Sequence, residues 1–187
     1  MKTKAILGLL VAGAMSFTAC TNKVDEKTIS EINQFGTEWS ALGERANSWG
    51  NELSQTTAKA KEFAVQQTTL ANNMATTKDE SMKAKVNEMA GKASQDASNF
   101  EAMENEWNTF KSTWDETTKQ FTEWKDKVMK GEVTPEEASK GIEDYKAKLA
   151  EAQAKVDTWT AQYAEVKSSC EQNMAMAQSM NMPAEKK

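Results

Sequence analysis

The chain has 187 residues, of which 27% are charged, and a formal net charge of −5 at neutral pH. This excess of acidic residues argues against a nucleic-acid partner, because binding to the phosphate backbone requires a cluster of basic side chains. The chain has no histidine, so the commonest general base and the commonest metal ligand are both absent. It also lacks a Gly-rich phosphate loop and a nucleophile elbow, so we expect no enzymatic activity and no cofactor.

The N-terminal segment has the three-part layout of a secretory signal peptide. Lys2 and Lys4 precede an apolar run over 6–15, and four small or apolar residues then lead into Cys20. The run is about half as long as the ~20 residues that a membrane-spanning helix needs, so we expect residues 1–19 to be cleaved off. Cleavage removes two lysines and no acid, which changes the net charge from −5 to −7.

Thr18 and Ala19, directly before Cys20, resemble the lipobox of bacterial lipoproteins, although Phe17 stands where that motif usually has Leu. The resemblance implies that Cys20 is acylated and anchors the mature chain in membrane lipid. Thr21 follows the cysteine in place of the Asp that retains some lipoproteins at the inner membrane, which favours the outer membrane of a bacterial envelope. The alternative is an ordinary cleavage site beside an unmodified cysteine.

Capping signals divide the rest of the chain into helices. A Ser or Thr three residues before a Glu forms a capping box, and the chain has such pairs at Thr28–Glu31, Thr77–Glu80 and Thr134–Glu137. Pro135 suits the first position of a helix, where its missing N–H costs nothing. These signals predict helices over about 28–75, 79–130 and 135–178, after a lipidated linker at 20–27 and before a flexible tail at 181–187.

Apolar residues recur in heptads along each predicted helix, and every aromatic residue after the leader falls in a heptad core position. Short turns make consecutive helices antiparallel neighbours, so we expect an all-α, elongated, antiparallel three-helix bundle or coiled coil at 28–180. Trp49, Trp107 and Trp159 then lie at one level. We expect a dry core with no pocket larger than a side chain. The alternative, a Trp-lined ligand platform, requires some aromatic rings to face outward.

Three glycines repeat every seven residues beside the core positions of the first helix, at Gly36, Gly43 and Gly50. Glycine inside a helix costs about 1 kcal/mol relative to alanine, so a compensating contact is expected. We favour close packing of a helix within the bundle. Contact with a second molecule is the alternative.

Polar residues interrupt the core series at Gln67, Asp96 and Thr117. An unpaired buried carboxylate is costly, so we expect Asp96 to reach water or the Thr56 hydroxyl. Gln67 and Thr117 are expected to fix the register of the helices.

Sulfur-containing residues are concentrated toward the C-terminus. Their spacing resembles that of methionine-rich Cu(I) sites. The candidate ligands are Cys170, Met174, Met176, Met180 and Met182. Several neighbours in this run lie on different faces of a helix, and methionine is a common filler of irregular cores. We therefore expect no metal site here, and keep a small-ligand or Cu(I) carrier as an alternative function.

These features predict a lipid-anchored envelope lipoprotein with a structural or protein-interaction role, as a monomer or weak homo-oligomer. Its expected partners are membrane lipid, through Cys20, and an envelope protein or peptidoglycan. A terminal Lys187 resembles the lysine that joins the major outer-membrane lipoprotein to peptidoglycan, so a tether is a further alternative. A bundle that opens onto membranes, as apolipoprotein-like proteins do, is disfavoured because the apolar stripes are narrow and rich in Trp.

Overall fold

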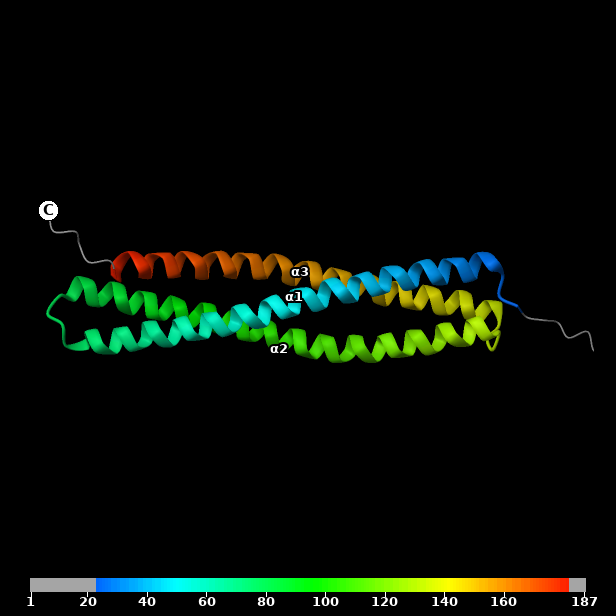
Figure 1. The fold of residues 1–187 in the computed structure, drawn as a ribbon, viewed down its shortest axis with the longest axis horizontal. Helices are drawn as coiled ribbons and strands as arrows, with labels where there is room; N and C mark the ends of the chain where they lie inside the picture. The colour runs from blue at the N-terminus through cyan, green and yellow to red at the C-terminus, as the bar shows by residue number, and fades with distance from the viewer. Residues whose placement is uncertain (1–22, 182–187) are drawn as a thin grey trace, which may run out of the picture.

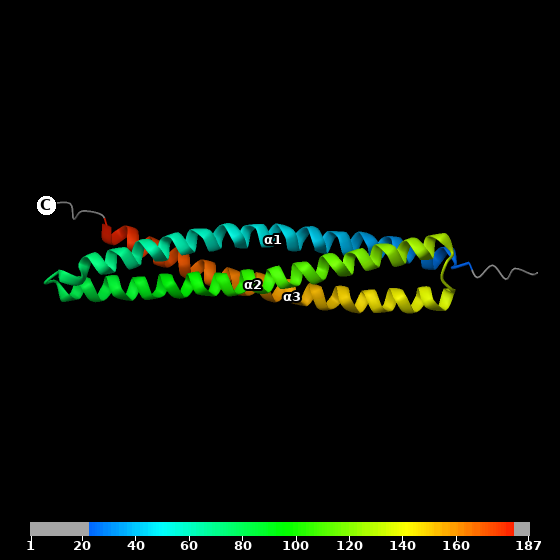
Figure 2. The same cartoon turned by 90° about the horizontal axis from the view of Figure 1, so that it is seen from below.

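The computed structural model describes residues 23–181, which form three long helices and one short one (Figure 1). The elements are α1 (Glu26–Asn73), the 3₁₀ helix η1 (Met74–Thr76), α2 (Glu80–Lys130) and α3 (Pro135–Asn181). The helices reverse direction at each turn and lie along one another over their whole length (Figures 1 and 2). The predicted all-α, antiparallel three-helix bundle is thus confirmed.

The first two helices begin at an aspartate and not at the predicted threonines. Asp25 Oδ1 accepts the Thr28 N–H at 2.8 Å, and Asp79 Oδ1 accepts the Met82 N–H at 3.0 Å. A carboxylate caps the positive end of a helix at least as well as a hydroxyl. The first helix therefore begins at Glu26, within the predicted linker, and Thr28 lies in its first turn.

The start of α3 and the end of α2 follow the sequence prediction. The Glu137 N–H donates to Thr134 Oγ1 at 3.2 Å, and the Thr134 N–H donates to Glu137 Oε2 at 2.8 Å. Gly131 ends α2 with φ of 72°, a left-handed conformation that favours glycine. Because one short turn joins both features, α3 folds back directly onto α2.

Tryptophans from all three helices meet in the core, as the heptads predict. Trp49 stacks on Trp159 with ring centroids 5.6 Å apart, and it meets Trp107 edge to face at 5.7 Å. In the neighbouring layer the Phe100 and Tyr163 rings are 5.9 Å apart. Eleven of the thirteen aromatic residues between positions 23 and 181 are buried, and Phe110 and Trp124 are half-buried.

The glycine stripe of α1 is filled from within the bundle. Gly50 lies against the Trp107 indole, and a β-carbon at Gly43 would lie 3.2 Å from Trp114 Nε1. Gly36 faces the same helix, α2. Large side chains of α2 thus occupy the space that the glycines leave, and α1 and α2 pack closely.

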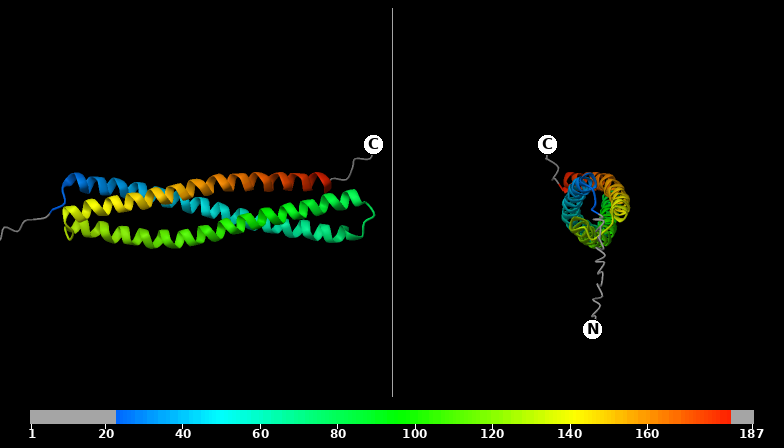
Figure 3. Two further views of the ribbon diagram at one scale, coloured as in Figure 1. Left: turned by 180° about the vertical axis from the view of Figure 1, so that it is seen from behind. Right: turned by 90° about the vertical axis from the view of Figure 1, so that its right-hand side faces the viewer.

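The first residue of α1 and the last residue of α3 lie at opposite ends of a rod (Figures 1 and 3). α1 has 48 residues, and a rise of ~1.5 Å per residue gives a length of about 70 Å. The turn between α2 and α3 lies at the same end as the start of α1. In residues 23–181 no helix is both long and apolar enough to cross a membrane.

Candidate functional site

A groove with a volume of about 620 Å³ runs between α2 and α3. Its floor includes Phe110, Trp114 and Trp159. The Phe110 ring lies parallel to Trp114, with centroids 5.9 Å apart, and edge-on to Trp159 at 5.2 Å. The expectation of no pocket larger than a side chain is therefore wrong.

At the level of the groove, the two seams of α2 differ in the size of the side chains that meet, although further along the α3 seam Trp124 also packs against a glycine, Gly141. On the α1 side, Trp107 and Trp114 lie against glycines, so the helices approach closely. On the α3 side, the rings of Phe110 and Trp159 contact each other, which holds the helices apart. Ala152 lines the same stretch, and its methyl group is too small to fill the space that results.

The wall contributed by α2 carries a column of threonines one helical turn apart. Thr109, Thr113 and Thr117 all line the groove. Each hydroxyl donates to the backbone carbonyl four residues earlier, at 3.0, 3.2 and 2.7 Å respectively. Because these hydrogens are already used within the helix, the column offers a ligand methyl groups and oxygen lone pairs. The predicted register residue Thr117 is thus part of the groove wall.

The wall contributed by α3 carries charged side chains. Glu151 pairs with Lys155 at 3.3 Å. Lys148 Nζ lies 4.9 Å from the centre of the Tyr145 ring and makes no ion pair within residues 23–181. Lys148 is therefore the ammonium group in this wall that remains available to a ligand.

The two ends of the groove have opposite charge. Glu106 lines one end and accepts the Trp159 indole N–H at 3.0 Å. Lys148 lies eleven positions before Trp159 in α3, so about 16 Å of helix separates it from that end. Because α2 and α3 are antiparallel, Lys148 lies opposite Thr117. The groove therefore has an aromatic floor, a Glu151–Lys155 ion pair on one wall, a carboxylate at one end and, at the other, an ammonium without an ion-pair partner within residues 23–181.

The sulfur atoms of the predicted Cu(I) run are divided between the core and the surface. Cys170 is buried, Met174 and Met180 pack against the core, and Met176 is 44% exposed. Burial, together with the nearby carboxylates of Asp96 and Glu171, raises the pKa of the Cys170 thiol, which disfavours the thiolate that binds metal. Met182 lies outside the described residues. Among residues 23–181, no group of three or more His, Cys, Asp or Glu side chains could hold a metal ion.

Asp96 is buried, and its carboxylate bonds to α3. Its Oδ1 accepts the Ser169 hydroxyl at 3.0 Å, and its Oδ2 accepts the Asn173 amide at 2.6 Å. The predicted partner, the Thr56 hydroxyl, instead shares a hydrogen bond of 2.8 Å with the Tyr163 hydroxyl. The carboxylate therefore ties α2 to α3 at one register. Its partner Asn173, also buried, lies seven residues after Val166 and so continues a core series of the third helix.

Gln67 is buried as predicted for a core position. Its carbonyl oxygen has no hydrogen-bond partner in the part of the chain that the structure describes. It lies on α1 near the end of the rod that carries η1.

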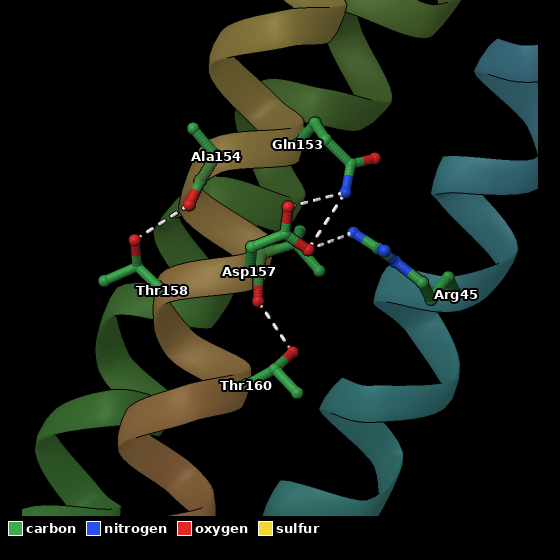
Figure 4. A network of polar contacts seen from close by, with 7 residues as sticks. Arg45, Gln153, Ala154, Asp157, Thr158 and Thr160 are labelled. Carbon is green, nitrogen blue, oxygen red and sulfur yellow. Dashed lines mark hydrogen bonds and ion pairs between the residues drawn. The ribbon is translucent and has the colours of Figure 1, made fainter.

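On the seam between α1 and α3, Arg45 points at Asp157 (Figure 4). Arg45 Nη2 lies 3.0 Å from Asp157 Oδ1, and Gln153 Nε2 donates to both oxygens of the same carboxylate at 2.9 and 2.8 Å. The hydrogen bonds from Gln153, and then the Arg45 charge, hold the pKa of Asp157 below its usual range. All three side chains are used in this network, so we assign it to the register of α1 against α3.

The groove was missed in the sequence, although two signals for it are present. Phe110 follows Thr109 directly, and Thr113 and Thr117 continue the threonine column beside the aromatic positions. Two residues with an expected chemical role, Cys20 and Lys187, lie outside residues 23–181.

No known protein family, curated protein or solved structure matches this chain.

Proposed function

We propose that the chain is a lipid-anchored envelope lipoprotein whose helical rod has a structural or protein-interaction role and no enzymatic activity. The observation that carries the proposal is the position of the rod's two ends. α1 starts a few residues after Cys20, and the turn between α1 and α2 lies about 70 Å away. An acyl group on Cys20 would hold one end at the bilayer and present the other end at a distance from it.

The surface charge supports an anchor made of lipid and not of basic side chains. Acidic residues outnumber lysine and arginine by 28 to 23, so anionic headgroups would repel the rod on balance. Long-range attraction to the membrane surface is therefore weak, and stable attachment would depend on acyl chains.

The anchor is tested by changing Cys20 to Ser in the full chain. We expect the wild-type protein to incorporate labelled palmitate and to stay with membranes after a carbonate wash. The C20S protein should incorporate no label and appear in the soluble fraction. Membrane attachment of C20S equal to that of the wild type would contradict the proposal.

The interaction role is tested by photo-crosslinking from both ends of the rod. Lys78 and Glu132 are exposed residues in the distal and membrane-proximal turns, respectively. A crosslinker at Lys78 should capture a discrete envelope protein, whereas the matched position Glu132 should capture lipid or nothing. Equal, diffuse labelling from both positions would argue against a partner at the distal end.

Attachment of Lys187 to peptidoglycan is a separate form of the same structural role, since the far end of the rod is where α3 ends. Muramidase digestion followed by mass spectrometry would reveal a muropeptide joined to Lys187.

A Cu(I) carrier is disfavoured by the division of Cys170, Met174, Met176 and Met180 between core and surface. Sub-micromolar Cu(I) binding that disappears when the three methionines become Leu would reverse that preference.

A further inference from the structure

The groove between α2 and α3 is an unassigned space in the bundle, and it differs from the other hollows in its chemistry. The hollow at Asp96 also lies between α2 and α3, but polar side chains, including Ser169 and Asn173, line it. A smaller hollow between α1 and α3, of about 390 Å³, is lined by Arg45, whose guanidinium already bonds to Asp157. Only the first groove combines an aromatic floor with an unpaired charge at one end, among the hollows described for residues 23–181.

Size limits what the groove can hold. Its volume of about 620 Å³ lies within the range of ~300–1,000 Å³ that is typical of small-molecule sites. Its length of about 16 Å, from the eleven positions that separate Thr117 from Glu106, leaves a narrow cross-section. An α-helix with side chains is ~10–12 Å across, so a single extended hydrocarbon chain fits this shape better than a fourth helix does.

The lining determines which end of such a molecule goes where. Phe110, Trp114 and Trp159 offer apolar surface along the channel, and the α2 threonines add methyl groups. Glu106 disfavours an anion at its end of the groove, whereas Lys148 has no ion-pair partner in residues 23–181 at the other end. Glu151 also lines the groove, three residues after Lys148, but its carboxylate is paired with Lys155. An anionic group is therefore stabilised beside Lys148, with the chain extending toward Trp159.

We propose that this groove binds the hydrocarbon chain of a single-chain fatty carboxylate, with the carboxylate beside Lys148. This inference is independent of the lipid anchor at Cys20, because it concerns a free ligand and a site built wholly from α2 and α3. The proposal makes the rod a carrier or sensor of such amphiphiles as well as a spacer.

The first test is calorimetric titration of residues 23–187 with dodecanoate below its critical micelle concentration. This part of the chain contains every core residue of the bundle from Val24 to Met180. We expect saturable binding of one molecule, with affinity rising up to about four-fold per added methylene across a homologous series. The rise should stop once the chain fills the groove. A rise without a plateau, or no binding at millimolar concentration, would overturn the proposal.

Substitutions then locate the ligand. Thr113 is an exposed residue in the middle of the wall, so Thr113→Phe should fill the channel and abolish binding. Thr122→Phe is the matched control, since Thr122 is exposed on the same helix and outside the groove. Circular dichroism and thermal unfolding would show that both variants fold. Equal binding by the two variants would contradict the assigned site.

Charge reversal tests the position of the carboxylate. Lys148→Glu should weaken dodecanoate binding on the order of ten-fold, whereas Lys140→Glu, at an exposed position outside the groove, should leave it unchanged. Dodecyltrimethylammonium should bind the wild type more weakly than dodecanoate and should prefer the Lys148→Glu variant. Equal binding of both amphiphiles would contradict the placement of the ligand carboxylate beside Lys148.

A second copy of the chain is the other possible occupant of the groove. A wild-type dimer that dissociates when Thr113 is changed to Phe would identify it, and would overturn the proposal.

Discussion

A β-carbon at Gly50 would lie 2.2 Å from Cε2 of the Trp107 indole. Such a distance is far inside van der Waals contact, so the indole occupies the place where any other residue would put its side chain. The glycines of α1 therefore leave room for side chains of α2. Their cost in helix propensity is offset by the close approach of the two helices that they permit.

Replacing Gly50 with Ala should destabilise the bundle. Alanine gains about 1 kcal/mol of helix propensity, but forcing atoms into a filled core costs about 1–3 kcal/mol or more, and Trp107 is buried and large. We expect a lower midpoint of urea unfolding. Gly91→Ala is the control, because nothing lies within 4 Å of its added β-carbon. That variant should be stabilised by about 0.5–1 kcal/mol, and a similar gain for Gly50→Ala would refute the steric argument.

Replacing Asp96 with Ala should leave the Ser169 hydroxyl and the Asn173 amide without their acceptor. Because Asn173 is buried, we expect a loss of about 1–3 kcal/mol in the free energy of unfolding. The measurement is a double-mutant cycle of Asp96→Ala and Asn173→Ala by urea unfolding. Strict additivity of the two losses would show that the hydrogen bond of 2.6 Å contributes nothing.

The Glu52 carboxylate should make stability depend on acid pH. The Lys167 ammonium, and then the Tyr163 hydroxyl, donate hydrogen bonds that hold the pKa of Glu52 below its usual 4.5. A carboxylate with a lowered folded-state pKa stabilises the fold above its unfolded pKa, and this stabilisation is lost as pH falls through the folded value. Wild type should therefore be more stable than Glu52→Gln at neutral pH.

The difference in melting temperature between wild type and Glu52→Gln should shrink as pH falls below about 4.5. Glu44 makes no ion pair or side-chain hydrogen bond within residues 23–181, so Glu44→Gln serves as the control and should show no such trend. A difference for Glu52→Gln that stays constant from pH 7 to pH 3 would contradict the assigned interaction.

The Cys170 thiol should react slowly in the folded protein. It is buried, and burial raises its pKa, so both access and thiolate content are low. Iodoacetamide labelling followed by mass spectrometry should therefore report opening of α3. Ser168→Cys in a Cys170→Ala background is the matched control at an exposed position, and it should label at the rate of an unfolded peptide. Equal rates at the two positions would show that this end of the bundle is open.

The fold could be predicted from the sequence because its determinants are local or periodic. Thr134, Pro135 and Glu137 mark a helix start within four residues, and the heptads place Trp49 and Trp159 in one layer. The capping residues of α1 and α2 are Asp25 and Asp79 and not the predicted Thr28 and Thr77, because an aspartate and a threonine close together both satisfy the rules for an N-cap. Choosing between them depends on where the chain enters the bundle.

The groove could not be predicted from periodicity, which assigns a residue to the core without giving the distance between helices. That distance depends on which residues meet. Trp107 meets a glycine on one side, whereas Phe110 meets Trp159 on the other, and the two seams differ accordingly. The partners of Asp96 were missed for the same reason, since Ser169 and Asn173 become its neighbours only through the pairing of α2 with α3.

An odd number of antiparallel helices also determines how the rod responds to tension. If force is applied between the start of α1 and the end of α3, at opposite ends of the molecule, these helices are pulled in opposite directions along the long axis. The Trp–Gly contacts of α1 and the Asp96 hydrogen bonds of α3 would then be strained together in shear, and not broken one after another as in a hairpin pulled open from one end. Unfolding under such a force therefore requires whole seams between helices to slide past one another.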